Sequence, residues 1–215
     1  MIIFQNDILV YFGDRRDSLT EILVQHPKLK FKKIRQTHSA IVVEASAVLN
    51  EADAHYTTSA NEALLIATAD CMPILIYCRQ THRVAAVHAG WRGIENRITE
   101  KTLQKLFETG SSKKDFQIWV GPHIQQNSFE IDLITLKRLQ ALQHNLQAER
   151  YITERNNKYY VALIKILESQ IKNFTEKPTQ IHSLDIDTKT NSDYYSYRRE
   201  QMTKERNLSF ICLLS

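Results

Sequence analysis

The sequence of 215 residues holds few of the residues that build long linkers or disulfide frameworks. It has five Gly and four Pro, so long flexible linkers are not expected, and its length fits one domain spanning residues 1–215. Its three cysteines, Cys71, Cys78 and Cys212, are too few and odd in number for a disulfide framework. We therefore expect reduced thiols that are free to act as ligands or nucleophiles, as is usual in the cytoplasm.

Long apolar runs and a strong excess of one charge are also missing. No stretch approaches the ~20 apolar residues of a membrane-spanning helix, and the first residues lack the basic start and apolar run of a secretory signal. The net charge of +4 is mild and the basic residues are scattered. We therefore expect a cytoplasmic protein without a membrane or nucleic-acid partner. The short basic clusters at 28–33 and 197–199 are either solvated surface or a contact for an anionic substrate such as phosphate.

Apolar periodicity predicts strands mainly in the first part of the chain and helices mainly in the second. The expected strands cover 8–12, 41–45, 63–68, 74–78, 84–88 and 209–214, and a further strand ends at Gly121-Pro122. The expected helices cover 94–107, with a stop at Gly110, and then 134–146 and 161–174. This mixture predicts an α+β domain in which helices cover the faces of the sheets.

The two apolar strands at 74–78 and 84–88 predict a buried hairpin that brings two reactive side chains together. If its turn centres between Gln80 and Thr81, His88 lies opposite Pro73, and Cys71 sits two residues further along the same face. Diagonal neighbours of this kind are ~7 Å apart, which is within reach of a shared metal ion. A turn shifted by one residue would place the two side chains on opposite faces.

Three interpretations of this pair remain open. His38 follows a basic strand-like run and precedes a strand, which makes it our candidate for a third ligand, and three protein ligands with an open position are typical of catalytic zinc. Without a metal, Cys71 could be a nucleophile with His88 as its base. Cys71 could also be no more than a small buried hydrophobic residue at the end of a strand.

A second group of candidate site residues surrounds this pair. Gly90-Trp91-Arg92-Gly93 leads into the helix expected at 94–107, so Arg92 and Gly93 could bind phosphate through the guanidinium and the backbone amides of the helix N-terminus. Such a glycine-rich segment is often only a turn. Asp70, next to Cys71, could orient a ligand or carry a proton.

The chain resembles the YfiH-type or laccase-domain family, long described as multicopper polyphenol oxidases. The resemblance rests on segments that occur in the family's order: Gln36-Thr37-His38, Ala52-Asp53-Ala54, Thr68-Ala69-Asp70-Cys71-Met72-Pro73, His88-Ala89-Gly90-Trp91-Arg92-Gly93, Gly121-Pro122, Phe129-Glu130-Ile131 and Tyr194-Tyr195-Ser196-Tyr197-Arg198-Arg199. It implies a layered α-β-β-α sandwich with mixed sheets, and a zinc site on His38, Cys71 and His88.

The resemblance also implies an activity. We therefore expect a purine nucleoside phosphorylase that acts on adenosine, inosine, guanosine or methylthioadenosine with phosphate, and adenosine deamination as a second activity. The active site would contain Cys71, His88, Asp70 and Arg92. Bacterial relatives are also linked to the editing of cell-wall precursors. The physiological purine and the oligomeric state stay open.

Two departures from the family's pattern and the scarcity of metal ligands qualify this expectation. His123 and Ser128 stand where the family usually has cysteines, and Asp187-Thr188 stands where a Cys-Thr pair is usual. Multicopper clusters need many histidines, often in His-x-His pairs, and this chain has no such pair. The ligands of the sequence therefore support one metal site rather than a multicopper cluster, the resemblance implies zinc there, and which of zinc and copper is bound in the cell stays open. The alternatives are a cysteine hydrolase that uses Cys71 and His88, and a structural zinc or interaction module without catalysis.

Overall fold

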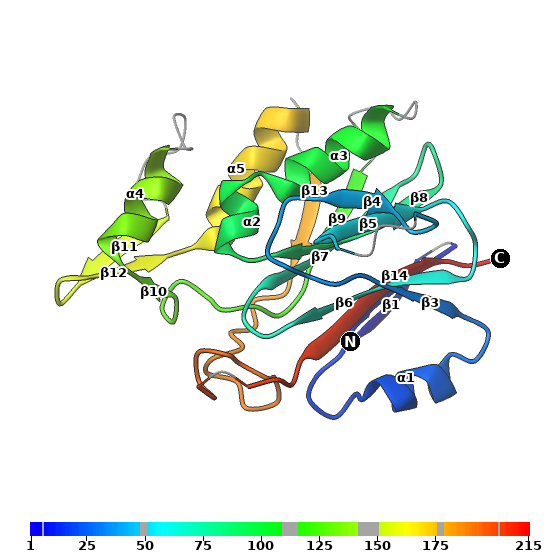
Figure 1. The fold of residues 1–215 in the computed structure, drawn as a ribbon, viewed down its shortest axis with the longest axis horizontal. Coiled ribbons are helices and arrows are strands. Elements are labelled where there is room, and N and C mark those ends of the chain that lie inside the picture. The colour runs from blue at the N-terminus through cyan, green and yellow to red at the C-terminus, as the bar shows by residue number, and fades with distance from the viewer. Residues whose placement is uncertain (6, 48–50, 109–115, 142–150, 176–178, 202) are drawn as a thin grey trace.

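Two mixed β-sheets lie face to face, and helices cover the outer face of each (Figure 1). The computed structural model describes the chain except for residues 6, 48–50, 109–115, 142–150, 176–178 and 202. The layered α-β-β-α arrangement in one α+β domain confirms the expected fold class. Within each sheet, parallel and antiparallel neighbours occur together.

The first sheet has five strands and holds the C-terminal strand near its centre. Their order is β1 (Ile2–Gln5), β2 (Ile8–Phe12), β14 (Asn207–Leu213), β6 (Glu62–Thr68) and β3 (Lys30–Lys33). The helix α1 (Leu19–Gln25) covers its outer face and packs Ile22 against Tyr11 and Phe210 in a small apolar cluster. A capping box between Ser18 and Glu21 starts this helix.

The second sheet carries the candidate site, and its outer face is covered by three helices. The strand order is β13 (Gln180–Ser183), β9 (Phe116–Val120), β7 (Met72–Cys78), β8 (Arg83–Ala89), β5 (Ala54–Thr57) and β4 (Val42–Glu44). The covering helices are α2 (Trp91–Glu95), α3 (Ile98–Glu108) and α5 (Leu163–Thr175). Beside them lie α4 (Leu133–Ala141) and a small sheet of β10 (Glu130–Ile131), β12 (Lys158–Val161) and β11 (Ile152–Arg155).

The central hairpin has the expected register. Pro73 pairs with His88 and Cys78 pairs with Arg83, so β7 and β8 are antiparallel around the predicted turn. Both strands are buried on both faces because alternate residues enter different cores. Leu75 and Tyr77 face the other sheet, whereas Ile74 and its neighbours on that face pack under the helices.

The helices differ from the predicted ones at their boundaries. The segment expected as one helix over 94–107 is two, because α2 already begins at Trp91 and α3 begins only at Ile98. Arg97 lies between them with φ of 58°, a left-handed conformation that ends a helix. Val161 belongs to β12, and α5 begins at Leu163. The expected stop at Gly110 and the predicted helix beyond residue 141 lie outside the described residues.

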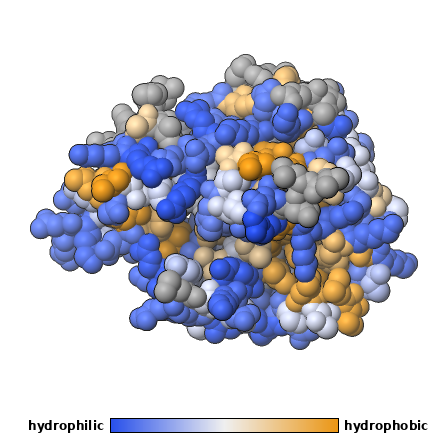
Figure 2. All heavy atoms as spheres, in the orientation of Figure 1, coloured by the Kyte–Doolittle hydropathy of each residue, from blue (hydrophilic) through white to orange (hydrophobic). Residues whose placement is uncertain are grey.

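Most of the surface in Figure 2 is hydrophilic, with apolar patches over α1 and α4. Exposed large hydrophobic residues include Leu23 and Val24 on α1 and Leu133 and Ile134 on α4. A search of the described helices for a segment long and apolar enough to cross a membrane found none.

Candidate metal centre and substrate cavity

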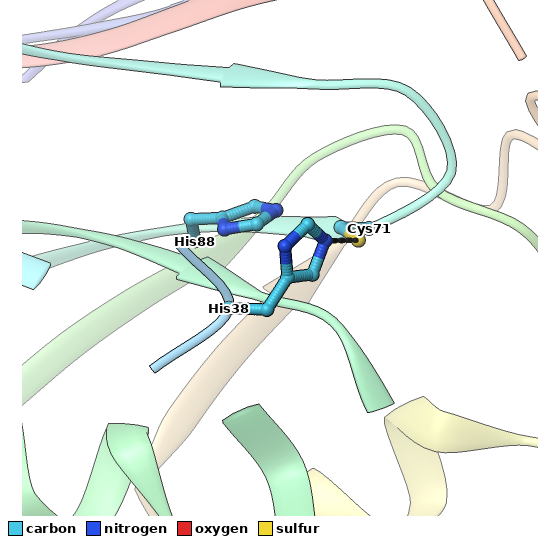
Figure 3. A group of neighbouring side chains, drawn as sticks. All are labelled: His38, Cys71 and His88. Atoms are coloured by element: carbon cyan, nitrogen blue, oxygen red, sulfur yellow. Dashed lines mark hydrogen bonds between the residues drawn. The ribbon is translucent and has the colours of Figure 1, made fainter. Parts of the chain in front are cut away.

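Three segments that are far apart in the sequence bring His38, Cys71 and His88 together. His38 lies in the loop between β3 and β4, Cys71 directly precedes β7, and His88 lies near the end of β8 (Figure 3). One ligand atom from each residue lies within 4.8 Å of those of the others, and Cys71 Sγ is 3.8 Å from His38 Nε2. Zinc binds sulfur at ~2.3 Å and imidazole nitrogen at ~2.0 Å, so modest adjustments would let all three reach one ion.

The backbone around the group allows this close approach. A Cβ on Gly90 would lie 2.8 Å from Cys71 Sγ and 3.2 Å from His38 Cδ2, so a larger residue would collide with two of the three side chains. His38 and Asp70 both have positive φ, 59° and 82°. Non-glycine residues in this region are uncommon and cluster at functional sites.

Asp53 is the residue of the site that the sequence analysis missed. It is fully buried at the entry to β5, and its Oδ1 accepts hydrogen bonds from His88 Nδ1 at 2.7 Å and from the backbone N–H of His38 at 3.0 Å. Oδ2 accepts from Ser39 N and Ser39 Oγ, both at 2.6 Å, and from Thr37 N at 3.1 Å. The sequence signals were its place in Ala52-Asp53-Ala54, one of the segments that carry the family resemblance, and its position between two alanines, where burial demands hydrogen-bond partners.

The group favours a charged thiolate. Burial alone would raise the pKa of Cys71, but hydrogen bonds with His38 and His88 lower it to about 6. Burial lowers the pKa of His88, but its contacts with Asp53 and Cys71 outweigh this and raise the value to about 9. Near pH 7 the metal-free group therefore holds a thiolate beside an imidazolium. The thiolate is the form of cysteine that binds metals and attacks electrophiles.

A cavity of about 530 Å³ opens over this group, and its volume lies within the range of small-molecule sites. Its wall includes three aromatic rings and three guanidinium groups, from Trp91, Phe129, Tyr197, Arg92, Arg198 and Arg206. The predicted residue Arg92 thus faces the cavity, and so does Arg198 from the basic cluster at 197–199. Gly93 is buried within α2 and is not among the lining residues.

Asp70 lines the cavity, but hydrogen bonds engage both of its carboxylate oxygens. Oδ1 accepts from Thr188 Oγ1 at 2.6 Å and Oδ2 from the backbone N–H of Arg198 at 2.7 Å. These contacts tie the C-terminal segment to the residue next to Cys71. The carboxylate therefore holds the cavity wall in place next to Cys71.

The residues that stand where the family has cysteines, His123, Ser128 and Asp187, contact one another and are not among the residues that line the cavity. Ser128 Oγ donates to Asp187 Oδ2 at 2.5 Å, and the backbones of His123 and Asp187 form a β-bridge. His123 is buried, which lowers its pKa, and its Nδ1 donates to the carbonyl of Gly121 at 2.8 Å. Among the described residues, the group of close potential metal ligands is His38, Cys71 and His88, and it does not include these three.

Comparisons with known proteins agree with the resemblance. Residues 13–214 match the model of the family described as multi-copper polyphenol oxidoreductase laccase. A protein of Clostridium acetobutylicum named purine nucleoside phosphorylase is 32% identical over 183 residues, which cover 83% of this chain and 75% of that protein. A Haemophilus influenzae protein of the same name is 30% identical over 174 residues, with coverages of 79% and 69%.

Solved structures show the same fold. A crystal structure of a Neisseria meningitidis protein superposes with a TM-score of 0.83 at 22% identity, covering 98% of this chain and 96% of the other. The crystal structure of Bacillus licheniformis hypothetical protein YfiH also gives a TM-score of 0.83, at 19% identity, with coverages of 96% and 92%.

Proposed function

Since the chain belongs to the family described as multi-copper polyphenol oxidoreductase laccase, with relatives named purine nucleoside phosphorylase, we propose that it is a zinc-dependent purine nucleoside phosphorylase. Its proposed substrates are phosphate with adenosine, inosine, guanosine or methylthioadenosine, and adenosine deamination is its proposed second activity. The observation that carries this proposal is the His38, Cys71 and His88 group at a cavity that is both aromatic and basic.

The cavity offers separate surfaces to the two parts of the reaction. A purine is flat and can stack on the rings of Trp91, Phe129 or Tyr197, which line the wall. Phosphate would bind Arg92, whose guanidinium lies 4.3 Å from the centre of the Trp91 ring, with Arg198 adding positive charge nearby. Because α2 has only five residues and Gly93 is buried in it, we assign phosphate binding to the guanidinium rather than to the helix N-terminus.

Phosphorolysis is a displacement at the anomeric carbon. A phosphate oxygen forms the new bond to this carbon, the bond to the purine nitrogen breaks, and its electron pair leaves with the base, which takes up a proton. The products are ribose 1-phosphate and the free purine. Arg92 would hold the phosphate in line for attack and offset its charge. Asp70 would keep Cys71 in place against the C-terminal segment through its hydrogen bonds to Thr188 and Arg198.

The donor set fits zinc. His38, Cys71 and His88 would hold the ion with two imidazole nitrogens and one thiolate, and three protein ligands leave a position open to the cavity. Bound zinc would supply Lewis-acid chemistry and water activation, which is the chemistry that hydrolytic deamination requires. Cys71 contributes as a thiolate at neutral pH, and His88 is held by Asp53 with its other ring nitrogen directed away from that carboxylate.

The pairing of Cys71 with His88 favours a second candidate, a cysteine hydrolase for a peptide-like or cell-wall precursor substrate. A thiol whose pKa is lowered to about 6 beside a histidine is an activated nucleophile. The two functions respond differently to metal removal. If activity survives complete removal of zinc and is lost on thiol alkylation, the hydrolase explains the site and the zinc-dependent enzyme does not.

The direct test supplies purified protein with phosphate and inosine and measures hypoxanthine and ribose 1-phosphate. Metal analysis should give one zinc ion per chain in the wild type and much less in His38→Ala. Arg92→Ala should raise the KM for phosphate about tenfold or more, since a charged hydrogen bond contributes ~1.5–3 kcal/mol. Arg138→Ala is the matched control, because Arg138 also lies over Trp91, at 5.1 Å, but pairs with Glu95 and is not among the cavity-lining residues.

Absence of turnover on every nucleoside, together with unfolding of Cys71→Ala, would instead support a structural metal or interaction module. Stoichiometric zinc retained by His38→Ala would remove this histidine from the ligand set.

A further inference from the structure

One carboxylate oxygen contacts both histidine segments of the candidate metal centre. Asp53 Oδ1 accepts from the Nδ1–H of His88 at 2.7 Å and from the backbone N–H of His38 at 3.0 Å. The two segments are far apart in the sequence, since His38 lies in a loop and His88 lies in β8, and their rings meet edge to face with centroids 4.8 Å apart. The backbone carbonyl of Asp53 also accepts from His88 N at 2.7 Å, so the side chain and main chain of one residue both hold His88.

These bonds determine which ring nitrogen of His88 faces Cys71. Nδ1 carries the proton that it donates to Asp53, so Nε2 is left for Cys71 or for an ion. A carboxylate behind a metal-binding histidine fixes its tautomer and ring orientation in this way. The pair is shielded from water, since the side chain of His88 is 4% exposed and that of Asp53 is 0% exposed.

The second oxygen shapes the His38 loop. Oδ2 accepts from Ser39 N and Ser39 Oγ at 2.6 Å and from Thr37 N at 3.1 Å. Together with the contact to His38 N, three consecutive backbone amides converge on one carboxylate. His38 occupies the left-handed region with φ of 59°, a conformation that persists only where its surroundings determine it. Asp53 supplies these surroundings.

We propose that Asp53 is a positioning residue that sets both histidine ligands against Cys71, His88 through its ring and His38 through its backbone. This inference rests on the proposed metal centre. It assigns Asp53 no contact with substrate or metal.

Asp53→Asn is the decisive variant because an amide cannot replace both oxygens. If the amide oxygen occupies the Oδ1 position, its NH₂ group faces the N–H groups of Thr37 and Ser39, which are also donors. If it occupies the Oδ2 position, the NH₂ group faces His88 Nδ1–H and His38 N–H. Either orientation displaces one of the two histidines while the volume of the side chain is almost unchanged.

The matched control is Asp187→Asn. Asp187 also accepts from a serine hydroxyl, at 2.5 Å from Ser128 Oγ, and from backbone amides, including Lys189 N at 3.0 Å. It is not among the residues that line the cavity or form the ligand group. The control therefore has a similar loss of hydrogen bonding without a change at His38 or His88.

The first measurement is titration of each metal-free protein with cobalt(II) and with zinc. We expect Asp53→Asn to lose about 10- to 100-fold in affinity, the usual effect of removing a partner behind a metal ligand, and to show altered cobalt d–d bands. Asp187→Asn should match the wild type in both. Wild-type affinity and an unchanged cobalt spectrum in folded Asp53→Asn would overturn the proposal.

The second measurement needs no metal, so it separates this proposal from the proposed function. Nitrogen-15 NMR of histidine rings in the metal-free wild type should show His88 protonated at Nδ1 and hydrogen-bonded there, and Asp53→Asn should change this signal or that of His38. A wild type that binds no metal would overturn the metal centre, while unchanged ring signals would overturn the role of Asp53. If Asp53→Asn does not fold, Ser39→Ala keeps the carboxylate and removes the hydroxyl, with its contacts to Asp53 and to the Ile41 N–H. It should shift the signals of His38 but not those of His88, and unchanged His38 signals would count against the proposal.

Discussion

Replacing Gly90 by alanine should push Cys71 away from the two histidines. The new Cβ would lie 2.8 Å from Cys71 Sγ, whereas ordinary contacts begin near 3.4 Å, so Sγ must retreat by about 0.6 Å. Gly90 has φ of −78°, which alanine adopts without backbone strain. The expected effect is therefore steric, and it acts on the position of one ligand atom.

The metal-bound state should carry most of this strain. In the metal-free protein the thiolate can turn aside, but a bound ion requires ligand distances within about 0.2 Å of their usual values. Overpacking of a well-packed site costs ~1–3 kcal/mol, which corresponds to a roughly 5- to 150-fold loss of zinc affinity. Competition with a coloured chelator at fixed pH measures that affinity, and thermal unfolding of the metal-free protein measures the effect on stability.

Gly13→Ala is the control for a crowded glycine away from the ligands. Its Cβ would lie 2.9 Å from the Leu208 carbonyl and 3.0 Å from Tyr11, so we expect a loss of stability without a loss of zinc affinity. If Gly90→Ala binds zinc as tightly as the wild type does, Cys71 Sγ is not held in the position required for the ion, and the assignment of Cys71 as a ligand is wrong.

The remaining predictions concern protonation and packing. Burial lowers the pKa of His55 to about 3, so between pH 3 and the unfolded value of ~6.5 the unfolded chain binds the extra proton and stability falls on acidification, by up to ~1.4 kcal/mol per pH unit. Urea unfolding should show ~1.6 kcal/mol more loss from pH 6.5 to 5 in the wild type than in His55→Gln, and equal losses would contradict this. In metal-free protein, mass spectrometry should find Cys71 alkylated with a midpoint near pH 6 and Cys212 unmodified, because burial raises the pKa of Cys212 to about 12. Gly121→Ala should lower the free energy of unfolding by ~1–3 kcal/mol or more, since its Cβ would lie 2.3 Å from Phe12 and 2.8 Å from Pro73; unchanged urea unfolding would refute it.

The hairpin was predictable because its information is local. Two apolar runs flank a short polar break, and their register follows from the centre of the turn, so the pairing of Pro73 with His88 can be derived from the order of the residues alone. The neighbouring helix was less accessible. Its break depends on Arg97 in a left-handed conformation, and arginine at that position carries none of the usual signals for a helix end.

The rest of the site depends on contacts between distant segments. His38 is one of eight histidines, and its position follows from the loop that leaves β3 and wraps around Asp53. Only the family resemblance singled out His38 beyond its place between two strand-like segments. The family segment Ala52-Asp53-Ala54 contains Asp53 but did not indicate its role, because that role is the sum of hydrogen bonds from two segments that no local periodicity relates.

The chemistry of the donors separates this chain from the family's multi-copper description. A cluster of several copper ions needs many imidazole ligands, whereas the described residues contain one group of potential metal ligands, with two histidines and one cysteine. A blue-copper centre uses the same two kinds of ligand but adds a weak axial methionine, and the nearby methionine, Met72, is packed in the apolar core beneath the helices. One Lewis-acid ion next to the arginine-lined cavity would therefore account for these residues better than a chain of redox metals, and one zinc ion per chain is the stoichiometry that would agree with it.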